Sequence, residues 1–220
     1  VSGDFHKAVL GLSMVSTVLV PLIVSLFVGL YWYYNDRYLE LLLTQPIPRK
    51  TILAARFASL CLIIGAAIMV GTISPFLIYA HFDDEVLLLA AINLALTSVF
   101  VSVAIWIVLS VRDRLRGMAA IFGFWLYFVF VHDGIVLLVL LLLKDYPLDL
   151  ICGWMGVVNP LGMARILLLS KFDSAALLSH AGALVRQAIQ GPALYWVAMA
   201  VFGLWIAIPG VVALRTFKRT

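Results

Sequence analysis

A histidine and an aspartate stand side by side within a long apolar stretch, as His132-Asp133, and Gly134 follows them. Ionisable residues in such surroundings are costly and usually face a protein interior or a watery cavity, where they relay protons, bind substrate or contact a metal. Polar side chains in apolar helices also join neighbouring helices by hydrogen bonds, so a buried hydrogen-bonded pair beside a glycine kink is the alternative interpretation. The sequence leaves both interpretations open.

Soft metal-binding side chains lie further along the chain. Cys152, Met155 and Met163 are followed by His180, and thiolate and thioether ligands suit Cu(I). Methionine is also ordinary packing material in apolar helices, and the C-x-x-M spacing is unspecific. We therefore keep Cys152, Met155 and His180 as metal candidates, while expecting the chain to bind no cofactor of its own.

The common catalytic signatures are missing from the sequence. It contains no HExxH metalloprotease motif, no GxSxG nucleophile turn and no GxxxxGK[ST] phosphate-binding loop. The histidines fall in different segments, so they do not form the stacked pair that would bind a haem between helices. We expect a non-catalytic chain.

The composition indicates a membrane protein. Of the 220 residues, 65% are hydrophobic and only 12% are charged, and the mean hydropathy is +1.13. A soluble domain has about 25% charged residues, so this chain lacks the polar surface that would cover a core in water. The net charge of +4 comes from short basic clusters between apolar runs, which does not indicate nucleic-acid binding. We predict an all-α integral membrane protein with one domain over residues 1–220.

Several apolar stretches meet the roughly 20 residues that a helix needs to cross a bilayer. Their unbroken apolar runs are much longer than the ~10-residue alternating strands of a membrane barrel. The five predicted spans are residues 8–33, 57–79, 86–111, 118–143 and 191–214.

The charges between the spans alternate in sign. The stretches 35–56 and 112–116 and the C-terminal tail are basic, whereas the stretch 81–85 is acidic and has no Lys or Arg. By the positive-inside rule the basic segments are cytoplasmic, which puts the C-terminus inside a bacterial inner membrane and Val1 outside. We therefore expect a sixth, N-terminal helix before Val1, so that both termini of the complete protein are cytoplasmic.

The longest connection, 144–190, is external in this topology. It contains Asn159-Pro160 and two short apolar helical stretches, 161–169 and 175–188. We expect these stretches to be interfacial or re-entrant helices, since another full span would reverse the side on which the basic tail lies.

The segment between the first two spans combines an amphipathic helix with two helix breakers. A short helix is predicted from Asp36, Pro46 and Pro48 interrupt it, and a new helix starts near Arg49. A short helix on the cytoplasmic face offers a contact to a soluble partner. Alternatively, it is an interfacial loop whose basic side chains reach toward anionic lipid.

This segment resembles the signature of the ABC-2 family of ABC-transporter permeases. That pattern has Glu followed by leucines, then Pro-Ile and a basic residue; here Pro48 replaces a frequent Ser, and one extra residue follows Glu40. Asn159-Pro160-Leu161 also resembles the Asn-Pro turn in the external segment of the family. The matching run reads Glu40-Leu41-Leu42-Leu43-Thr44-Gln45-Pro46-Ile47-Pro48-Arg49-Lys50.

The resemblance implies a type V exporter-like bundle of six helices that pairs with a second copy of itself and with a cytoplasmic ABC ATPase dimer, which holds the ATP and Mg. It also implies a periplasmic partner, contacted at Asn159 and Pro160. Within the family, the chain most resembles permeases that support copper-site assembly in nitrous oxide reductase. The implied ATPase-coupling segment is Arg37, Tyr38, Leu39, Glu40, Leu41, Leu42 and Leu43.

Two other functions fit the residues. A self-contained proton-linked secondary transporter or channel would use His132 and Asp133, although such folds usually carry two matching broken helices, and none is evident here. A purely structural membrane anchor would need no ATPase partner.

Overall fold

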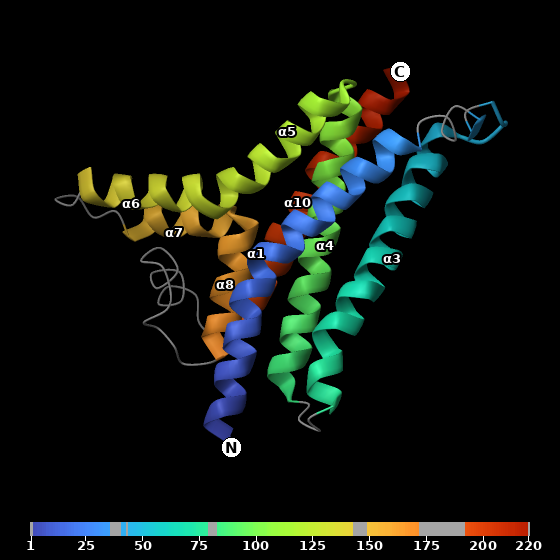
Figure 1. Ribbon diagram of the computed structural model, residues 1–220. Coiled ribbons are helices and arrows are strands. Elements are labelled where there is room, and N and C mark those ends of the chain that lie inside the picture. Colours follow the sequence, from blue (N-terminus) through green and yellow to red (C-terminus); the bar gives the residue numbers. More distant parts are fainter. Residues whose placement is uncertain are drawn as a thin grey trace.

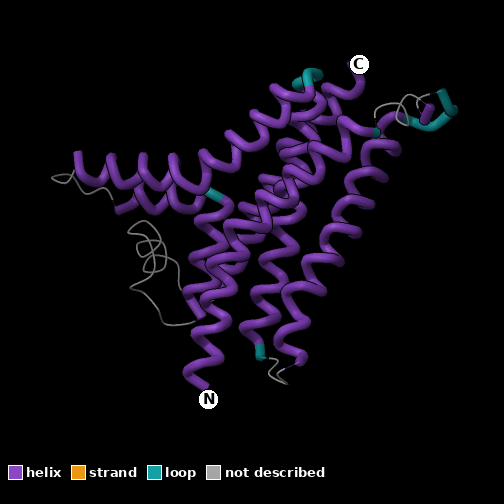
Figure 2. The backbone as a smooth tube through the Cα atoms, viewed as in Figure 1, coloured by secondary structure: helices purple, strands orange, loops and turns teal. Residues whose placement is uncertain are grey.

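The computed structural model describes residues 2–35, 41–42, 44–78, 83–142, 149–171 and 192–219. Within these ranges every regular element is a helix (Figure 2), and five helical stretches are long and apolar enough to cross a membrane. Helices satisfy their own backbone hydrogen bonds, which apolar surroundings require. The all-α prediction with five visible spans is thereby confirmed. The long helices are α1 (Ser2–Tyr34), α3 (Arg49–Ile78), α4 (Asp84–Ser110) and α10 (Pro192–Arg219); the remaining span consists of α5 (Arg114–Leu126), a π-helix (Tyr127–Val131) and α6 (His132–Leu142).

The two ends of the bundle differ in charge. One end, called the basic end below, carries the 44–48 segment, the turn between α4 and α5 and the C-terminal end of α10 (Figure 1). The other, the acidic end, carries the start of α1 and the start of α4, where Asp84 and Glu85 form the first turn. The charged segments therefore gather by sign.

Helix α4 forms the centre of the bundle and packs against α1, α3, α5, α8 and α10. Its most apolar window is 67% buried, against 22–39% for the other spans. Apolar residues lie on all its sides, as expected for a helix enclosed by others. The central position of α4 follows from this composition.

Helix α1 carries a small or hydroxylated residue at every fourth position of its buried side. Such residues let helix backbones approach closely where apolar side chains gain little from leaving lipid. The hydroxyl groups donate to carbonyls of the preceding turn, as from Thr17 to Ser13 at 2.6 Å and from Ser25 to Pro21 at 2.7 Å. The buried set is Ser13, Thr17, Pro21, Ser25 and Gly29.

The fourth apolar stretch is bent, rather than one straight span from 118 to 143. At the π-helix the chain turns, and α6 runs away from the bundle with α7 (Asp149–Val158) beside it (Figure 1). A π-helix inserts one extra residue into a turn, and such insertions are a known cause of sharp bends. We call this bend the elbow.

The predicted helix at 161–169 is confirmed as α8 (Pro160–Lys171). It lies alongside α1 and also packs on α4 and α10 (Figure 1). Its apolar side chains are almost fully enclosed, Leu161, Met163 and Ala164 being 0% exposed. Helix α8 is therefore part of the core and not a surface interfacial helix. The stretch 175–188 lies outside the described residues.

A compact corner joins α1 to the turn between α4 and α5. The Tyr33 hydroxyl donates to the Val111 carbonyl at 2.7 Å, and the Arg114 guanidinium lies 4.0 Å from the Tyr34 ring centroid. Gly117 makes room for this contact, because a Cβ at that position would overlap the Tyr33 hydroxyl. The C-terminal end of α1 is thereby fixed to the first turn of α5.

Candidate functional site

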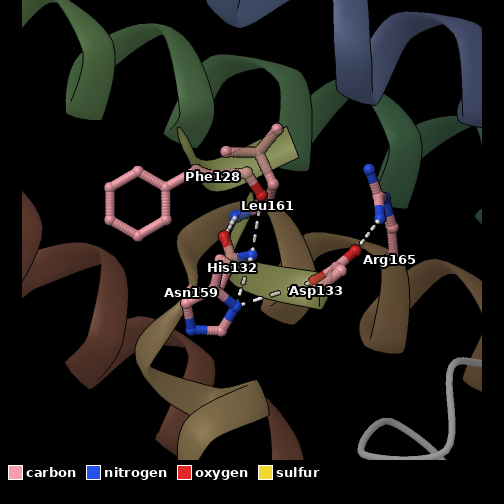
Figure 3. A network of polar contacts seen from close by, with 6 residues as sticks. All are labelled: Phe128, His132, Asp133, Asn159, Leu161 and Arg165. Carbon is pink, nitrogen blue, oxygen red and sulfur yellow. Dashed lines mark hydrogen bonds and ion pairs between the residues drawn. The ribbon is translucent and has the colours of Figure 1, made fainter. Parts of the chain in front are cut away.

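A buried polar cluster lies at the elbow, where α6 meets α8 (Figure 3). In the π-helix the His132 N–H bonds the Tyr127 carbonyl, five residues back, and not the Phe128 carbonyl four residues back. The Phe128 carbonyl instead accepts a hydrogen bond from the Asn159 side-chain amide at 3.0 Å. A polar group released by the π-helix is thus satisfied from another segment, as buried backbone groups require.

The same asparagine starts α8. Its Oδ1 accepts the Leu161 backbone N–H at 3.0 Å, and its carbonyl accepts the Met163 N–H at 2.9 Å. Asparagine is a favoured N-cap, and proline is favoured directly after it because the first helical N–H has no partner within the helix. Asn159-Pro160 is therefore a helix-start signal whose amide also holds the elbow.

The orientation of the Asn159 amide determines the role of His132. Its oxygen is occupied by the Leu161 N–H, so the Nδ2 group is the one that faces the His132 Nδ1 at 3.3 Å. Since Nδ2 only donates, His132 Nδ1 must accept, and a neutral ring then carries its proton on Nε2. The ring is 7% exposed and stacks on Phe128. The structure thus shows His132 as an enclosed side chain held by Asn159 and Phe128.

Asp133 pairs with an arginine of α8. Its Oδ2 lies 2.9 Å from Arg165 Nη1, and both side chains are partly buried. Its Oδ1 lies 3.6 Å from His132 Nδ1, but that nitrogen already accepts from Asn159, so we regard Arg165 as the partner that balances the carboxylate. Figure 3 shows the contact of Asp133 with Arg165, which bridges α6 and α8, and its contact with His132, which lies within α6.

The structure brings His132, Asp133 and Asn159 together, and it corrects one expectation. Asn159 is 0% exposed and Pro160 is buried, so neither side chain is available for the expected contact with a periplasmic partner. Sequence reasoning missed Arg165. The available signal was a cation in the middle of the apolar stretch 161–169, which needs an acidic partner.

The metal candidates do not converge in the described part of the chain. Within those residues no three His, Cys, Asp or Glu side chains lie close enough to hold a metal ion. Met155 is partly buried in α7, and Met163 packs in the core. His180 and the side chain of Cys152 lie outside the part of the chain that the structure describes, so their role as metal ligands stays a prediction.

At the basic end, the structure describes part of the predicted coupling segment. Leu41 and Leu42 are helical; Leu41 is 65% exposed, whereas Leu42 packs against the core. This is the orientation of an amphipathic helix with one side on the membrane domain and the other exposed. The other members, Arg37, Tyr38, Leu39, Glu40 and Leu43, lie outside the described residues.

The two prolines end this helix, and α3 begins at Arg49 as predicted. The Thr51 and Ile52 N–H groups both bond the Pro48 carbonyl, so the first turn of α3 forms directly after the proline. Residues 44–48 are all exposed. The segment is therefore a short surface feature held between two spans.

Beneath the segment, a buried arginine joins the two spans that flank it. Arg56 of α3 is 6% exposed, and its guanidinium lies 4.8 Å from the Trp32 ring centroid and 6.0 Å from that of Tyr31, both on α1. Cation–π contacts of this kind strengthen when they are shielded from water. Sequence reasoning counted Arg56 only among the basic loop residues.

Comparison with known proteins finds one family and two curated relatives. The sequence profile described as "ABC-2 family transporter protein" matches residues 34–220. A protein named "Probable ABC transporter permease protein NosY" from Pseudomonas aeruginosa is 28% identical over 96% of this chain and 79% of its own length. A protein of the same name from Stutzerimonas stutzeri is 26% identical over 94% of this chain and 78% of its own length.

The double role of Asn159 generates a prediction. Asn159→Ser keeps an N-cap oxygen for α8 but removes the amide from the Phe128 carbonyl and His132, so we expect a loss of about 1–3 kcal/mol in unfolding free energy. Asn159→Ala removes the cap as well and should cost about 1 kcal/mol more. Thermal and chemical unfolding of the purified variants measure both steps.

The difference in unfolding free energy between the two variants gives the contribution of the cap. The difference between Asn159→Ser and the unmodified protein gives the contribution of the contact with the π-helix. If Asn159→Ser unfolds like the unmodified protein, the amide contact at the elbow contributes nothing.

Proposed function

This chain belongs to the ABC-2 family of transporter proteins, and we propose that a separate cytoplasmic ATPase drives it through the segment at its basic end. As a permease subunit it is a non-catalytic, multi-pass membrane component, and ABC permeases work with an ATPase subunit. We place the basic end in the cytoplasm of a bacterial inner membrane, on the positive-inside rule. ATP and Mg would then bind to the partner ATPase and not to this chain.

The observation that carries this proposal is that Leu41 is exposed, whereas Leu42 and Arg56 nearby pack against the spans. Leu41 is 65% exposed at this surface-lying segment, so its side chain is available for contact with a protein or a membrane surface. Beneath it, Leu42 packs on the core and Arg56 joins the neighbouring spans. A push on the segment would therefore reach α1 and α3 together, as a rocking motion of the spans.

We further propose that the chain acts as a homodimer and, with a periplasmic partner, supports copper-site assembly of nitrous oxide reductase. The support is the 26–28% identity over most of the chain to two permeases named NosY. The connection 144–190 remains the proposed periplasmic contact, without Asn159 and Pro160. The output would be either export or mechanical signalling to that partner.

The alternative is a self-contained proton-linked transporter using His132 and Asp133. The contacts at the elbow disfavour it, because Asp133 is paired with Arg165 and His132 is enclosed and bonded to Asn159. A proton relay needs groups that exchange protons with a water path.

The coupling role predicts that Leu41→Asp strongly weakens binding of the ATPase. Placing an unpaired carboxylate in an apolar contact costs well over 1.4 kcal/mol, so co-purification of the ATPase with the membrane-bound permease should fall about tenfold or more. ATP turnover of the complex should fall in parallel. Quantitative pull-down and phosphate release measure the two effects.

A matched control is Asp84→Lys, an exposed charge change at the acidic end, which should leave both readouts unchanged. Charge reversal at Arg37 and Glu40 extends the test to the adjoining residues. Unchanged assembly and turnover in all of the segment variants would remove the coupling role.

The copper proposal predicts an effect in cells. Deleting the gene in its native host should leave nitrous oxide reductase present but deficient in copper, and the intact gene should restore the metal. The Leu41→Asp variant should fail to restore it, because the ATPase no longer drives the permease. Metal content of the purified reductase is the readout, and a fully loaded enzyme in the deletion strain would contradict this role.

The ion pair predicts energetic coupling between Asp133 and Arg165. Asp133→Asn and Arg165→Gln should each lower the unfolding free energy, and the double variant should lose less than the sum, by about 0.5–2 kcal/mol. Chemical unfolding of the four proteins gives this coupling. A proton-driven flux through vesicles containing this chain alone, lost in Asp133→Asn, would instead favour the transporter alternative.

A further inference from the structure

An apolar groove lies between α3 and α10 at the basic end, with α4 as its floor. Its volume is about 390 Å³, and nearly all of its lining is apolar, with Phe57 of α3, Ile105 of α4 and Ile206 and Leu214 of α10 among the lining residues. This size falls within the range of small-molecule sites in proteins. Since α3, α4 and α10 are candidate membrane spans, a bilayer around them would bring lipid to the mouth of this groove.

The groove is cationic at one end only. Lys50, in the first turn of α3, is the charged residue of its lining and is exposed. From Lys50 to Phe57 the helix rises by about 10 Å, so the lining passes from a charged end to a wholly apolar one. An anionic amphiphile matches this pattern, because its headgroup can pair with the cation while its hydrocarbon chain lies along the apolar part.

The neighbouring contacts strengthen the cationic end. Arg49 Nη1 donates to the Phe217 carbonyl at 3.2 Å, which joins α3 to α10 beside the groove, and Arg215 is exposed on the same end of α10. Among the described residues no acidic side chain lines the groove. Asp113 is an acidic residue of the turn at the basic end, and its carboxylate caps α5 by accepting the Arg116 N–H.

A second apolar groove provides the contrast. It has a volume of about 500 Å³ and lies between α7 and α10, with one residue each from α4 and α5. Trp106, Trp154 and Trp205 are among its lining. Among the residues that the structure describes, no charged one belongs to that lining, so the described lining offers no group that distinguishes one lipid headgroup from another. Selectivity for charge is expected only in the groove that contains Lys50.

We propose that the groove between α3 and α10 binds an anionic phospholipid of the leaflet at the basic end. One acyl chain lies along Phe57, Ile105 and Ile206, and the phosphate pairs with the Lys50 ammonium. Basic pockets between transmembrane helices commonly bind anionic headgroups. The site is separate from the proposed ATPase contact at Leu41, and it holds whether or not that contact exists.

The test compares phosphatidylglycerol with phosphatidylcholine of identical chains on the purified protein, by native mass spectrometry with lipid titration. We expect several-fold tighter binding of phosphatidylglycerol. Lys50→Gln should reduce this preference about fivefold, the contribution of one cation near a membrane surface. The matched control Arg112→Gln removes an exposed cation of the α4–α5 turn, outside the groove, and should keep the preference.

A second pair of variants tests the groove itself. Gly210 lines the groove, and a Cβ there would lie at ordinary contact distance, 3.5 Å, from Ser102 Oγ, so we expect the longer side chain of Gly210→Leu to extend into the groove. Gly203→Leu is the control on the same helix, where a Cβ meets nothing within 4 Å. Gly210→Leu should displace phosphatidylglycerol, and Gly203→Leu should not.

Three results would overturn the proposal. The first is equal binding of the two lipids by the unmodified protein. The second is competition by glycerol phosphate as effective as that of the whole lipid, which would mean that the acyl chain does not occupy the groove. The third is a Gly210→Leu variant that changes the oligomeric state while retaining the lipid, which would assign the groove to a second copy of the chain.

Discussion

The structure depends on one constraint: in apolar surroundings every polar group must find its partner within the protein. The Asn159 amide shows this most clearly, since one side chain satisfies the carbonyl released by the π-helix, the first turn of α8 and the inner nitrogen of His132. The hydroxyl groups of α1 meet the same requirement by bonding carbonyls of their own helix. Indole groups meet it between helices, as Trp125 does by donating to the Val18 carbonyl. The bent fourth span is possible because the Phe128 carbonyl, which the π-helix leaves without its helical partner, is satisfied from another segment.

The same constraint explains why the elbow contacts are arranged as they are. A π-helix costs a regular backbone hydrogen bond, and such insertions are often found at functional sites. Here the bend lets α6 leave the bundle while α8 returns into it, and the Asp133–Arg165 pair and Asn159 hold the two helices together. Without these contacts α8 would place a lone arginine and an unpaired amide among apolar side chains, which is unfavourable. The elbow and α8 therefore stabilise each other.

Local patterns predicted a large part of this fold, and tertiary contacts account for the remainder. Length and hydropathy predicted five spans, and two prolines predicted the start of α3 at Arg49, because both signals act within a few residues. The bend in the stretch 118–143 was not predicted, since a π-helix has no distinctive periodicity. Asn159 was recognised by its motif but given an exposed role, because its partner Phe128 lies 31 positions away in the sequence. The pairing of Asp133 with Arg165, 32 positions apart, was missed for the same reason.

If the proposed function holds, helix α5 connects the segment that the ATPase would contact with the elbow. It begins at the basic-end corner, where Tyr33 and Gly117 fix it to the last turn of α1, and it ends at the π-helix of the elbow. A helix transmits displacement along its axis because its backbone hydrogen bonds keep it stiff, whereas a π-helix is a point where the chain can change direction. A push on the segment between α1 and α3 would therefore reach α5 through the Tyr33–Val111 contact and become a change of angle at the elbow. The side-chain contacts of Asn159 and Arg165 would set how much of that movement α8 shares, since they are the described bonds that join α8 to the fourth span.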